Sequence, residues 1–416
     1  MIAILKFVNI RNTLLSMLIS LLVAFSGTCI AGGLQDTGFW GSDKLSRISI
    51  SILKGAIAEK PAPKLTRQNF SFSSGGRSFT ALTTLNPTLQ YYLDSLMTDA
   101  LGEFTAIVCV DPVSGRILAL SGFDRIHPGK HVWAQKLIPS ASIFKVVTAA
   151  GAIEFLGLGP DSVLTFNGGK HTLYRYQLKE KKTRYTTKVS LKEAFKDSIN
   201  PVFGKIGALY LKKKGLVEMA DRFFWQKEIP FEVPVKKSVI TVGDDSFSLA
   251  EVASGFNKAT KITALHGALI AASVLNRGVM MAPSFIDTIR SMDGNVVYQR
   301  RIYPLTRPIN PRTADILFDM MKATVSSGTA RKAFSGYSRD RVLKSLEIGG
   351  KTGTIDNENH ELRYDWFCGV AREKHGVRSM AVAVVVAHKD VLGTRAARFA
   401  RLAMKSYFGS LNKKDK

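Results

Sequence analysis

The apolar positions of this chain form several short runs near its two ends. Residues 105–110 and 116–121 are two such runs, and the sequence between them, Asp111-Pro-Val-Ser-Gly115, is typical of a tight turn. Three more strand-like runs follow near the carboxyl end, at 348–355, 365–371 and 379–387. Short apolar runs bounded by turn residues are typical of buried strands. The pattern therefore predicts a five-stranded, mainly antiparallel sheet whose strands come from both ends of the chain.

Helical periodicity fills most of the chain between and after these runs. Apolar residues recur at helical spacing from Leu89 to Met97. Further helices are predicted from Ser140 to Glu154 and at 249–256, 264–276, 313–325 and 394–407. Ser190 and Glu193 match a capping box, in which two side chains satisfy free backbone N–H groups where a helix begins. Together the segments predict an α/β (α+β) fold with flanking helices and an inserted all-helical block.

The amino-terminal segment carries no charge between Arg11 and Asp36, and Lys6 and Arg11 precede the uncharged run. A positive flank followed by an apolar stretch is typical of a signal peptide or a membrane anchor. We expect residues 1–33 to be a single-pass anchor, or a cleaved leader that releases the protein into the periplasm. The remaining chain is then extracytoplasmic. Residues 34–81 are rich in Pro, Gly and Ser and are expected to form a linker.

The composition is that of a globular protein, with 45% hydrophobic and 22% charged residues, which excludes disordered, collagenous and disulfide-scaffold classes. The formal net charge is +25, from 58 Lys and Arg against 33 Asp and Glu. This excess predicts a polyanionic neighbour, namely nucleic acid, an acidic envelope polymer or a membrane surface. The main cationic cluster, 179–182 with Arg184, has no nucleic-acid-binding motif beside it. For an extracytoplasmic chain we therefore expect anionic envelope material, and no nucleic acid, as the partner.

The few cysteines and histidines predict neither a disulfide framework nor a metal site. The residue before Cys29 does not suit a lipoprotein signal, so lipidation is not expected. Cys109 and Cys368 lie in strand-like runs, where either a disulfide or two buried thiols fits. His127 and His131 have the spacing of a helical metal pair, but a Pro-Gly pair between them prevents that helix. We expect no metal and no cofactor.

Three short patterns carry candidate chemistry. Ser142-Ile-Phe-Lys145 places a hydroxyl and an amine one helical turn apart on one face, where a neutral lysine can accept the serine proton. The S-x-x-K pattern also occurs at Ser51 and Ser410, so alone it has little specificity. The other two patterns are Ser198-Ile-Asn200 and Lys351-Thr-Gly-Thr354.

The order of the three patterns is more specific than any one of them. S-x-x-K begins a helix, S-x-N follows a helix, and K-T-G lies on a strand near the carboxyl end. In this order the chain resembles the transpeptidase domain of penicillin-binding proteins, in the family of active-site serine penicillin-recognising enzymes. The resemblance covers most of residues 82–408 and includes AIVCVDPVSGRILALSG, PSASIFKVVTAAGAIE, SSGTARKAF and DWFCGVA. It implies a serine β-lactamase/transpeptidase-like fold over residues 82–412, followed by a basic tail at 413–416.

Acyl transfer needs a nucleophile, a base for its proton and donors for the oxyanion. Ser142 is the expected nucleophile and Lys145 the expected base. The pKa of Lys145 must then fall well below the reference value of about 10.4. Burial and a neighbouring cation lower a lysine pKa, and Lys351 can supply that cation.

The resemblance implies the remaining roles. Ser198 would relay protons toward the leaving amine, and Asn200 would hydrogen-bond the substrate amide. The backbone N–H groups of the nucleophile and of Thr354 would form the oxyanion hole. The hydroxyls of Thr352 and Thr354, with the lysine of the same motif, would hold the terminal carboxylate of D-alanyl-D-alanine or the equivalent group of a β-lactam. Gly353 would let the substrate lie directly against the strand.

The resemblance also bears on the cysteines. In the family's sheet another strand separates the strand of Cys109 from that of Cys368, which puts them about 9.6 Å apart, twice the usual strand spacing. This exceeds the limit of about 7 Å for a disulfide. Both are therefore expected to be free thiols.

The implied function is that of a penicillin-binding D,D-transpeptidase, or a D,D-carboxypeptidase with the same Ser142 acyl-enzyme. It would act on peptidoglycan stem peptides and bind β-lactams. No glycosyltransferase domain is evident before the linker, so the expected protein partner is a glycosyltransferase or a membrane protein of the divisome or elongasome. One alternative is an oxacillinase-type serine β-lactamase or β-lactam sensor, whose second motif is usually Ser-x-Val, so that Asn200 disfavours it. A non-catalytic scaffold is disfavoured because all three motifs are intact.

Overall fold

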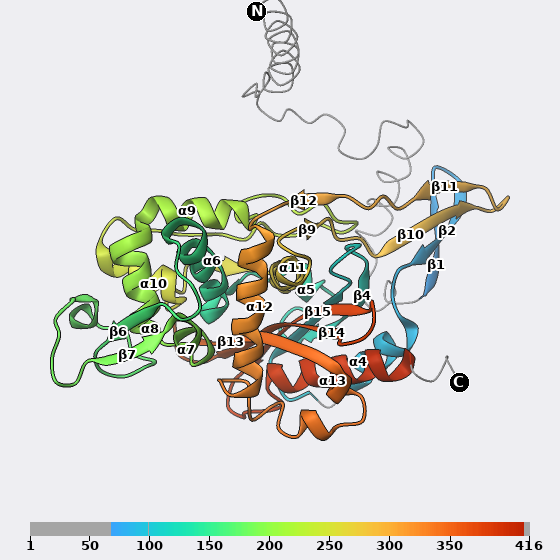
Figure 1. Ribbon diagram of the computed structural model, residues 1–416. Coiled ribbons are helices and arrows are strands. Elements are labelled where there is room, and N and C mark those ends of the chain that lie inside the picture. Colours follow the sequence, from blue (N-terminus) through green and yellow to red (C-terminus); the bar gives the residue numbers. More distant parts are fainter. Residues whose placement is uncertain (1–67, 99, 412–416) are drawn as a thin grey trace, which may run out of the picture. The chain divides into compact units, whose positions relative to one another are not determined.

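The structure of the chain is a computed structural model that describes residues 68–98 and 100–411 (Figure 1). The expected leader or anchor at 1–33, most of the expected linker and the basic tail at 413–416 lie outside the described residues. Among the described helices, none has both the length and the apolar character needed to cross a membrane.

A five-stranded antiparallel sheet forms the centre of the fold, in the order β13–β14–β15–β3–β4. Its strands, from both ends of the chain, are β3 (Phe104–Val110), β4 (Ile117–Asp124), β13 (Leu346–Asp356), β14 (Arg363–Glu373) and β15 (Ser379–His388). All five predicted strands are confirmed. The central strands β3 and β15 are buried along almost their whole length, because helices cover both faces of the sheet. Their sequences are therefore continuous apolar runs without the alternation of apolar and polar residues that a half-exposed strand shows.

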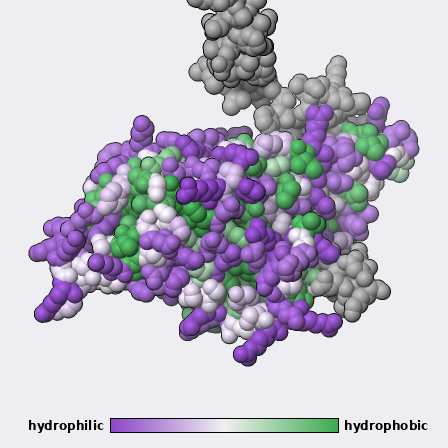
Figure 2. Space-filling view, in the orientation of Figure 1, coloured by the Kyte–Doolittle hydropathy of each residue, from purple (hydrophilic) through white to green (hydrophobic). Residues whose placement is uncertain are grey.

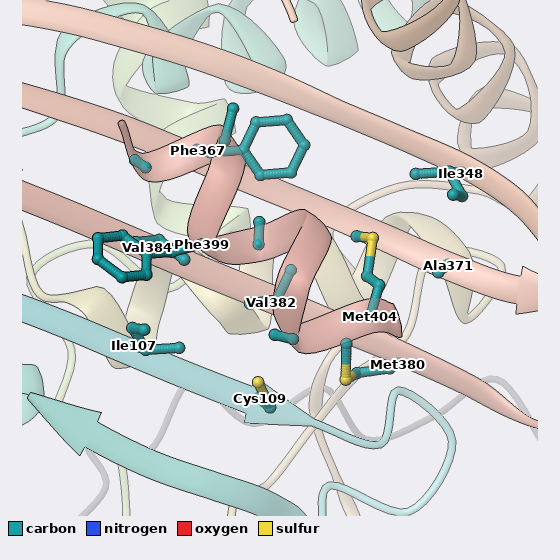
Figure 3. Close-up of a cluster of buried hydrophobic side chains, with 14 of the residues drawn as sticks. Ile107, Cys109, Ile348, Phe367, Ala371, Met380, Val382, Val384, Phe399 and Met404 are labelled. Atoms are coloured by element: carbon teal, nitrogen blue, oxygen red, sulfur yellow. The ribbon is translucent and has the colours of Figure 1, made fainter. Parts of the chain in front are cut away.

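One face of the sheet is covered by α4 (Pro87–Thr98) and α13 (Ala396–Leu411). In α13, Phe399 and Met404 point toward this face and share a core with Phe367, Val382 and Val384 (Figure 3). The apolar residues of α13 recur every three to four positions, which gives the helix the single buried stripe that a sheet can cover. The predicted carboxyl-terminal helix is thus confirmed.

The opposite face is covered by α11 (Ala264–Leu275). Cys368 Sγ lies close to Gly267 of α11, whereas Cys109 belongs to the core under α13. The two thiols therefore point to opposite faces, and β15 separates their strands. Both cysteines are free and buried, as predicted. Burial raises the pKa of both thiols.

The inserted block is mainly helical. Its helices are the 3₁₀ helix Ala141–Ile143, α6 (Phe144–Leu156), the 3₁₀ helix Arg175–Leu178, α7 (Leu191–Lys196), α8 (Asn200–Lys205), the π-helix Ile206–Leu211, α9 (Lys212–Arg222) and α10 (Ser246–Ser254). The capping box at α7 is present, with Ser190 N donating to Glu193 Oε2 at 2.8 Å and Glu193 N to Ser190 Oγ at 3.1 Å. The block also contains a hairpin of β6 (Val163–Phe166) and β7 (Thr187–Ser190), which the sequence pattern did not predict.

A second sheet, in the order β1–β2–β10–β11, corrects the predicted linker boundary. Its strands are β1 (Asn69–Ser74), β2 (Arg77–Thr83), β10 (Ile286–Ser291) and β11 (Val296–Gln299). Residues 69–81 were expected to belong to the linker, but β2 pairs with β10, so the folded unit begins at least as early as β1. Phe70, Phe72 and Phe79 are buried while serines between them face outward, and this alternation was hidden by a composition rich in Ser and Gly.

One long helix, α12 (Pro311–Ser326), and several short elements complete the described chain. The short elements are α5 (Val132–Gln135), β5 (Ile138–Pro139), β8 (Lys261–Ile262), β9 (Met280–Met281), β12 (Pro304–Thr306) and the 3₁₀ helices Tyr337–Arg339 and Leu343–Ser345. The helix α12 packs beside β13. It therefore borders the strand that carries the third sequence motif.

Candidate active site

Ser142 lies in the 3₁₀ helix immediately before α6, and Lys145 lies in the first turn of α6. The helix predicted to begin near Ser140 is present and starts with this 3₁₀ turn. Residues three apart on one continuous helical stretch lie on the same face, which brings the two side chains together. Lys145 Nζ donates to Ser142 Oγ at 2.8 Å. Ser142 is partly exposed, while Lys145 is fully buried.

The amine of Lys145 has three acceptors around it. Besides Ser142 Oγ, these are Asn200 Oδ1 at 2.7 Å and the Ser254 carbonyl at 2.5 Å. Burial, and secondly repulsion by Lys351, holds the pKa of Lys145 well below its ordinary value. A buried amine that is easily deprotonated and already bonded to a hydroxyl is suited to act as a base.

Lys351 of β13 is also fully buried. Its Nζ donates to Ser198 Oγ and to the Thr352 carbonyl, both at 2.9 Å. Burial lowers the pKa of Lys351 to about 7. Ser198 lies between α7 and α8 with a φ of +57°, and such left-handed conformations of non-glycine residues concentrate at functional sites. The two lysines thus each hold one serine hydroxyl of the site.

Asn200 begins α8 and connects several parts of the site. Its Oδ1 accepts from Lys145, and its Nδ2 donates to the His171 carbonyl at 2.8 Å. Its backbone N–H donates to the Lys170 carbonyl at 2.7 Å. The side chain therefore orients the amine of Lys145, a role that the sequence did not indicate.

The third motif lies at the edge strand of the central sheet, where Thr354 is exposed and Thr352 Oγ1 lies 2.6 Å from Thr329 Oγ1. A Cβ at Gly353 would lie 3.1 Å from Ala141 Cβ and 3.3 Å from Ser142 N. The sequence attributed this glycine to close approach of the substrate. The structure adds a different reason, because a side chain here would press on the nucleophile segment itself.

Two residues that hold this segment were missed by the sequence interpretation. Gly255, with a φ of +69°, ends α10, and a Cβ there would lie 1.9 Å from the Ala141 carbonyl oxygen. Trp366 of β14 donates from Nε1 to the Pro139 carbonyl at 3.0 Å. A glycine directly after a helix is a recognised stop signal, and it would have ended the predicted helix 249–256 two residues earlier, at Ser254.

A cavity of about 1010 Å³ joins these groups. It is lined by all the predicted site residues except the two lysines, namely Ser142, Ser198, Asn200, Thr352, Gly353 and Thr354. Lys145 and Lys351 lie behind this wall and reach it through the two serines. The structure thus brings together all eight residues that the sequence selected.

The lining of the cavity carries a net positive charge. Its charged residues are Lys258, Lys332, Arg363, Arg395 and Arg398, against Asp356 and Asp365. Both carboxylates are already paired, Asp356 with Arg363 at 2.8 Å and Asp365 with Arg395 at 2.9 Å. A net positive wall favours a substrate that carries a carboxylate. In the described part of the chain, no group of three or more His, Cys, Asp or Glu side chains is placed to hold a metal ion.

Comparison with known families and proteins agrees with this geometry. The family model described as penicillin binding protein transpeptidase domain matches residues 105–405. The peptidoglycan D,D-transpeptidase PbpA of Mycobacterium tuberculosis is 26% identical over 391 residues, covering 84% of this chain and 76% of that protein. The penicillin-binding protein PbpB of Mycolicibacterium smegmatis is 26% identical over 312 residues, covering 67% of this chain and 45% of that protein.

Solved structures share the fold. The D,D-transpeptidase domain of a peptidoglycan glycosyltransferase from Eggerthella lenta has a TM-score of 0.64 at 22% identity, covering 80% of this chain and 83% of that chain. The penicillin G acyl-enzyme complex of penicillin-binding protein A from M. tuberculosis has a TM-score of 0.64 at 24% identity, covering 79% of this chain and 80% of that chain.

Proposed function

The chain belongs to the penicillin-binding protein transpeptidase domain family, and on that premise we propose that it is a D,D-transpeptidase that cross-links peptidoglycan. Its substrates are stem peptides ending in D-alanyl-D-alanine, and β-lactams bind the same site. The observation that carries the proposal is the hydrogen bond between Ser142 Oγ and a fully buried Lys145 Nζ at the inner end of the cavity.

The first half-reaction follows from this pair. Ser142 Oγ attacks the carbonyl carbon of the penultimate D-alanine while its proton passes to neutral Lys145. The peptide C–N bond then breaks, and the leaving D-alanine takes a proton through Ser198, which Lys351 contacts. The product is an ester of Ser142. An amine of a second stem peptide attacks the ester carbonyl and forms the cross-link while the bond between Ser142 Oγ and the acyl carbon breaks. Ser142 Oγ takes back its proton from Lys145, and the proton that the amine loses returns through Ser198 to Lys351.

The other site residues bind the substrate. Thr352 and Thr354, with the charge of Lys351, hold the terminal carboxylate, and the net positive charge of the cavity lining supports binding of an anionic group. The backbone N–H groups of Ser142 and Thr354 stabilise the oxyanion. Asn200 contacts the substrate amide. Its bonds to Lys145 and to the His171 carbonyl use one acceptor position of Oδ1 and one hydrogen of Nδ2, so one of each remains for the substrate.

Release of D-alanine from a D-alanyl-D-alanine peptide, with and without an added amine acceptor, tests the proposal. A transpeptidase yields the amide product when the amine is present. Benzylpenicillin should leave a lasting acyl-enzyme at one equivalent per chain. Continuous hydrolysis of penicillin would instead indicate the oxacillinase-type alternative, and absence of both reactions would indicate a non-catalytic scaffold.

We further propose that residues 1–33 anchor the protein to the cell membrane, or guide it to the periplasm, so that the catalytic unit is extracytoplasmic. The positive flank and apolar run of this segment support the proposal. A glycosyltransferase or a membrane protein of the divisome or elongasome is the proposed protein partner. Fractionation of cells with a tagged chain tests the location.

Acylation by benzylpenicillin is expected to show a bell-shaped pH profile whose alkaline limb begins near neutrality. Burial and repulsion by Lys351 hold the pKa of Lys145 low, so that its amine is neutral and can act as a base. In acid the rate falls because Lys145 becomes protonated and can no longer accept the Ser142 proton. In alkali the rate falls because Lys351, with a pKa of about 7, loses the charge that binds the carboxylate. Stopped-flow acylation rates measure the profile. A rate that still rises at about pH 10, the range of an ordinary lysine, would contradict it.

A further inference from the structure

We propose that the loop between β6 and β7, residues 167–186, binds the glycan strand of the substrate polymer together with the carboxylates of the stem peptides attached to it. We call it the basic tyrosine loop. The inference rests on the proposed function, because it assigns a second contact to the same substrate. In Figure 1, β6 and β7 lie at one end of the helical block and the loop extends outward from them; Figure 2 shows that end as mainly hydrophilic.

The charge of the loop is strongly one-sided. Four of its exposed cations have no acidic partner among the described residues: Lys179, Lys181, Lys182 and Arg184. Lys170 is paired with Asp197 at 2.9 Å. Glu180, the sole acid in this segment of the sequence, accepts a hydrogen bond from Tyr210 at 2.7 Å. The loop therefore presents a local excess of positive charge, which attracts a polyanion.

Exposed aromatic rings accompany this charge. Tyr174, Tyr176 and Tyr185 are 54%, 55% and 70% exposed. The rings of Tyr174 and Tyr176 lie 5.8 Å apart at 12°, and the Arg184 guanidinium lies 4.7 Å from the Tyr185 ring centre. Amphipathic tyrosine rings are favoured at binding surfaces because they supply large contact area at low entropic cost. Flat rings fit the faces of sugar rings, and neighbouring cations can pair with carboxylates of the peptides that the sugars carry.

The backbone under the tyrosines is held in place. Gln177 is fully buried, accepts from Tyr174 N at 2.9 Å and donates to the Asn167 carbonyl at 2.8 Å. Leu173 and Leu178 are buried beside it. The two tyrosines therefore project from a preorganised turn, which reduces the entropy lost on binding.

The same loop forms part of the active-site wall. His171 lines the cavity, and the carbonyls of Lys170 and His171 accept hydrogen bonds from Asn200. A glycan strand held by the loop would run beside the cavity that receives its stem peptide. Because stem peptides hang from the glycan, this contact raises the local concentration of the peptide near Ser142.

Cosedimentation of the purified chain with insoluble peptidoglycan sacculi tests the inference. Two independent variants are Tyr174→Ser with Tyr176→Ser, and Lys181→Gln with Lys182→Gln. Matched controls are Tyr91→Ser, at a 79% exposed tyrosine of α4, and Lys236→Gln with Lys237→Gln. Both loop variants should weaken binding to sacculi by about fivefold or more. A loss of this size is typical when a residue that contributes substantially to the binding free energy of an interface is truncated. The controls should bind like the unchanged chain.

Acylation by benzylpenicillin separates this inference from the proposed function, because none of the four substituted loop residues lines the cavity that receives the small ligand. Loop variants that acylate normally but bind sacculi weakly support the inference. Normal acylation with unchanged sacculus binding overturns it, while failure of the unchanged chain to acylate overturns the proposed function instead. An equal loss of binding to phosphatidylglycerol vesicles or single-stranded DNA would also overturn the inference, because the loop would then be a general polyanion surface.

Discussion

Lys145→Met should lower the rate of acylation by benzylpenicillin by about 10²–10⁴-fold, the usual contribution of a positioned general base. Methionine keeps the apolar length of the side chain but cannot accept the proton of Ser142. Lys145 is assigned as the base because it is fully buried and its pKa is lowered, so its substitution should remove the proton acceptor of the site. Fluorescent-penicillin labelling, followed in time, measures the rate.

A matched control for this change is Lys205→Met. Lys205 is another buried lysine, in α8, and its Nζ donates to the Thr165 carbonyl at 3.2 Å. It does not line the cavity, so its variant should acylate at close to the unchanged rate. If Lys145→Met stayed within about tenfold of the unchanged chain, smaller than any general-base contribution, another group would be the base.

Gly255→Ala should reduce acylation by about 10²-fold, because displacement of a reacting group by about 1 Å has an effect of this size. A Cβ at Gly255 would lie 1.9 Å from the Ala141 carbonyl oxygen and 2.9 Å from Ser142 N. The segment that carries the nucleophile must therefore move. Acylation kinetics with thermal unfolding on the same sample measure the effect.

Gly157→Ala separates this displacement from backbone strain. Gly157 ends α6 with a φ of +67°, nearly that of Gly255, and a Cβ there meets nothing within 4 Å. Both variants incur the left-handed penalty of about 1–2 kcal/mol in stability, but only Gly255→Ala should lose acylation. Equal acylation rates in the two variants would contradict the packing argument.

The sequence predicted the parts of the fold whose signal is local. Four of the five central strands contain apolar runs, and Ser190 with Glu193 carries its capping signal within four residues. The active-site residues were predicted because their order along the chain is specific, although Ser142 and Lys351 lie far apart in sequence. The structure adds that each lysine contacts one of the two serines.

The features that the sequence did not predict depend on contacts between distant segments. The strand β2 forms its sheet with β10, so a hairpin rich in Ser and Gly resembled a linker. Position 255 needs a glycine because a Cβ there would collide with the Ala141 carbonyl oxygen. Trp366 Nε1 donates a hydrogen bond to the Pro139 carbonyl. Periodicity within a short window carries no information on such pairs. The role of Asn200 in orienting Lys145 is of the same kind.

Mass spectrometry of the chain after reaction with benzylpenicillin tests the central claim most directly. The account predicts one penicilloyl group per chain, located by peptide mapping on Ser142, and no adduct on the Ser142→Ala variant under the same conditions. An adduct on another residue, or one that persists in Ser142→Ala, would contradict the claim that Ser142 and Lys145 form the acylating pair.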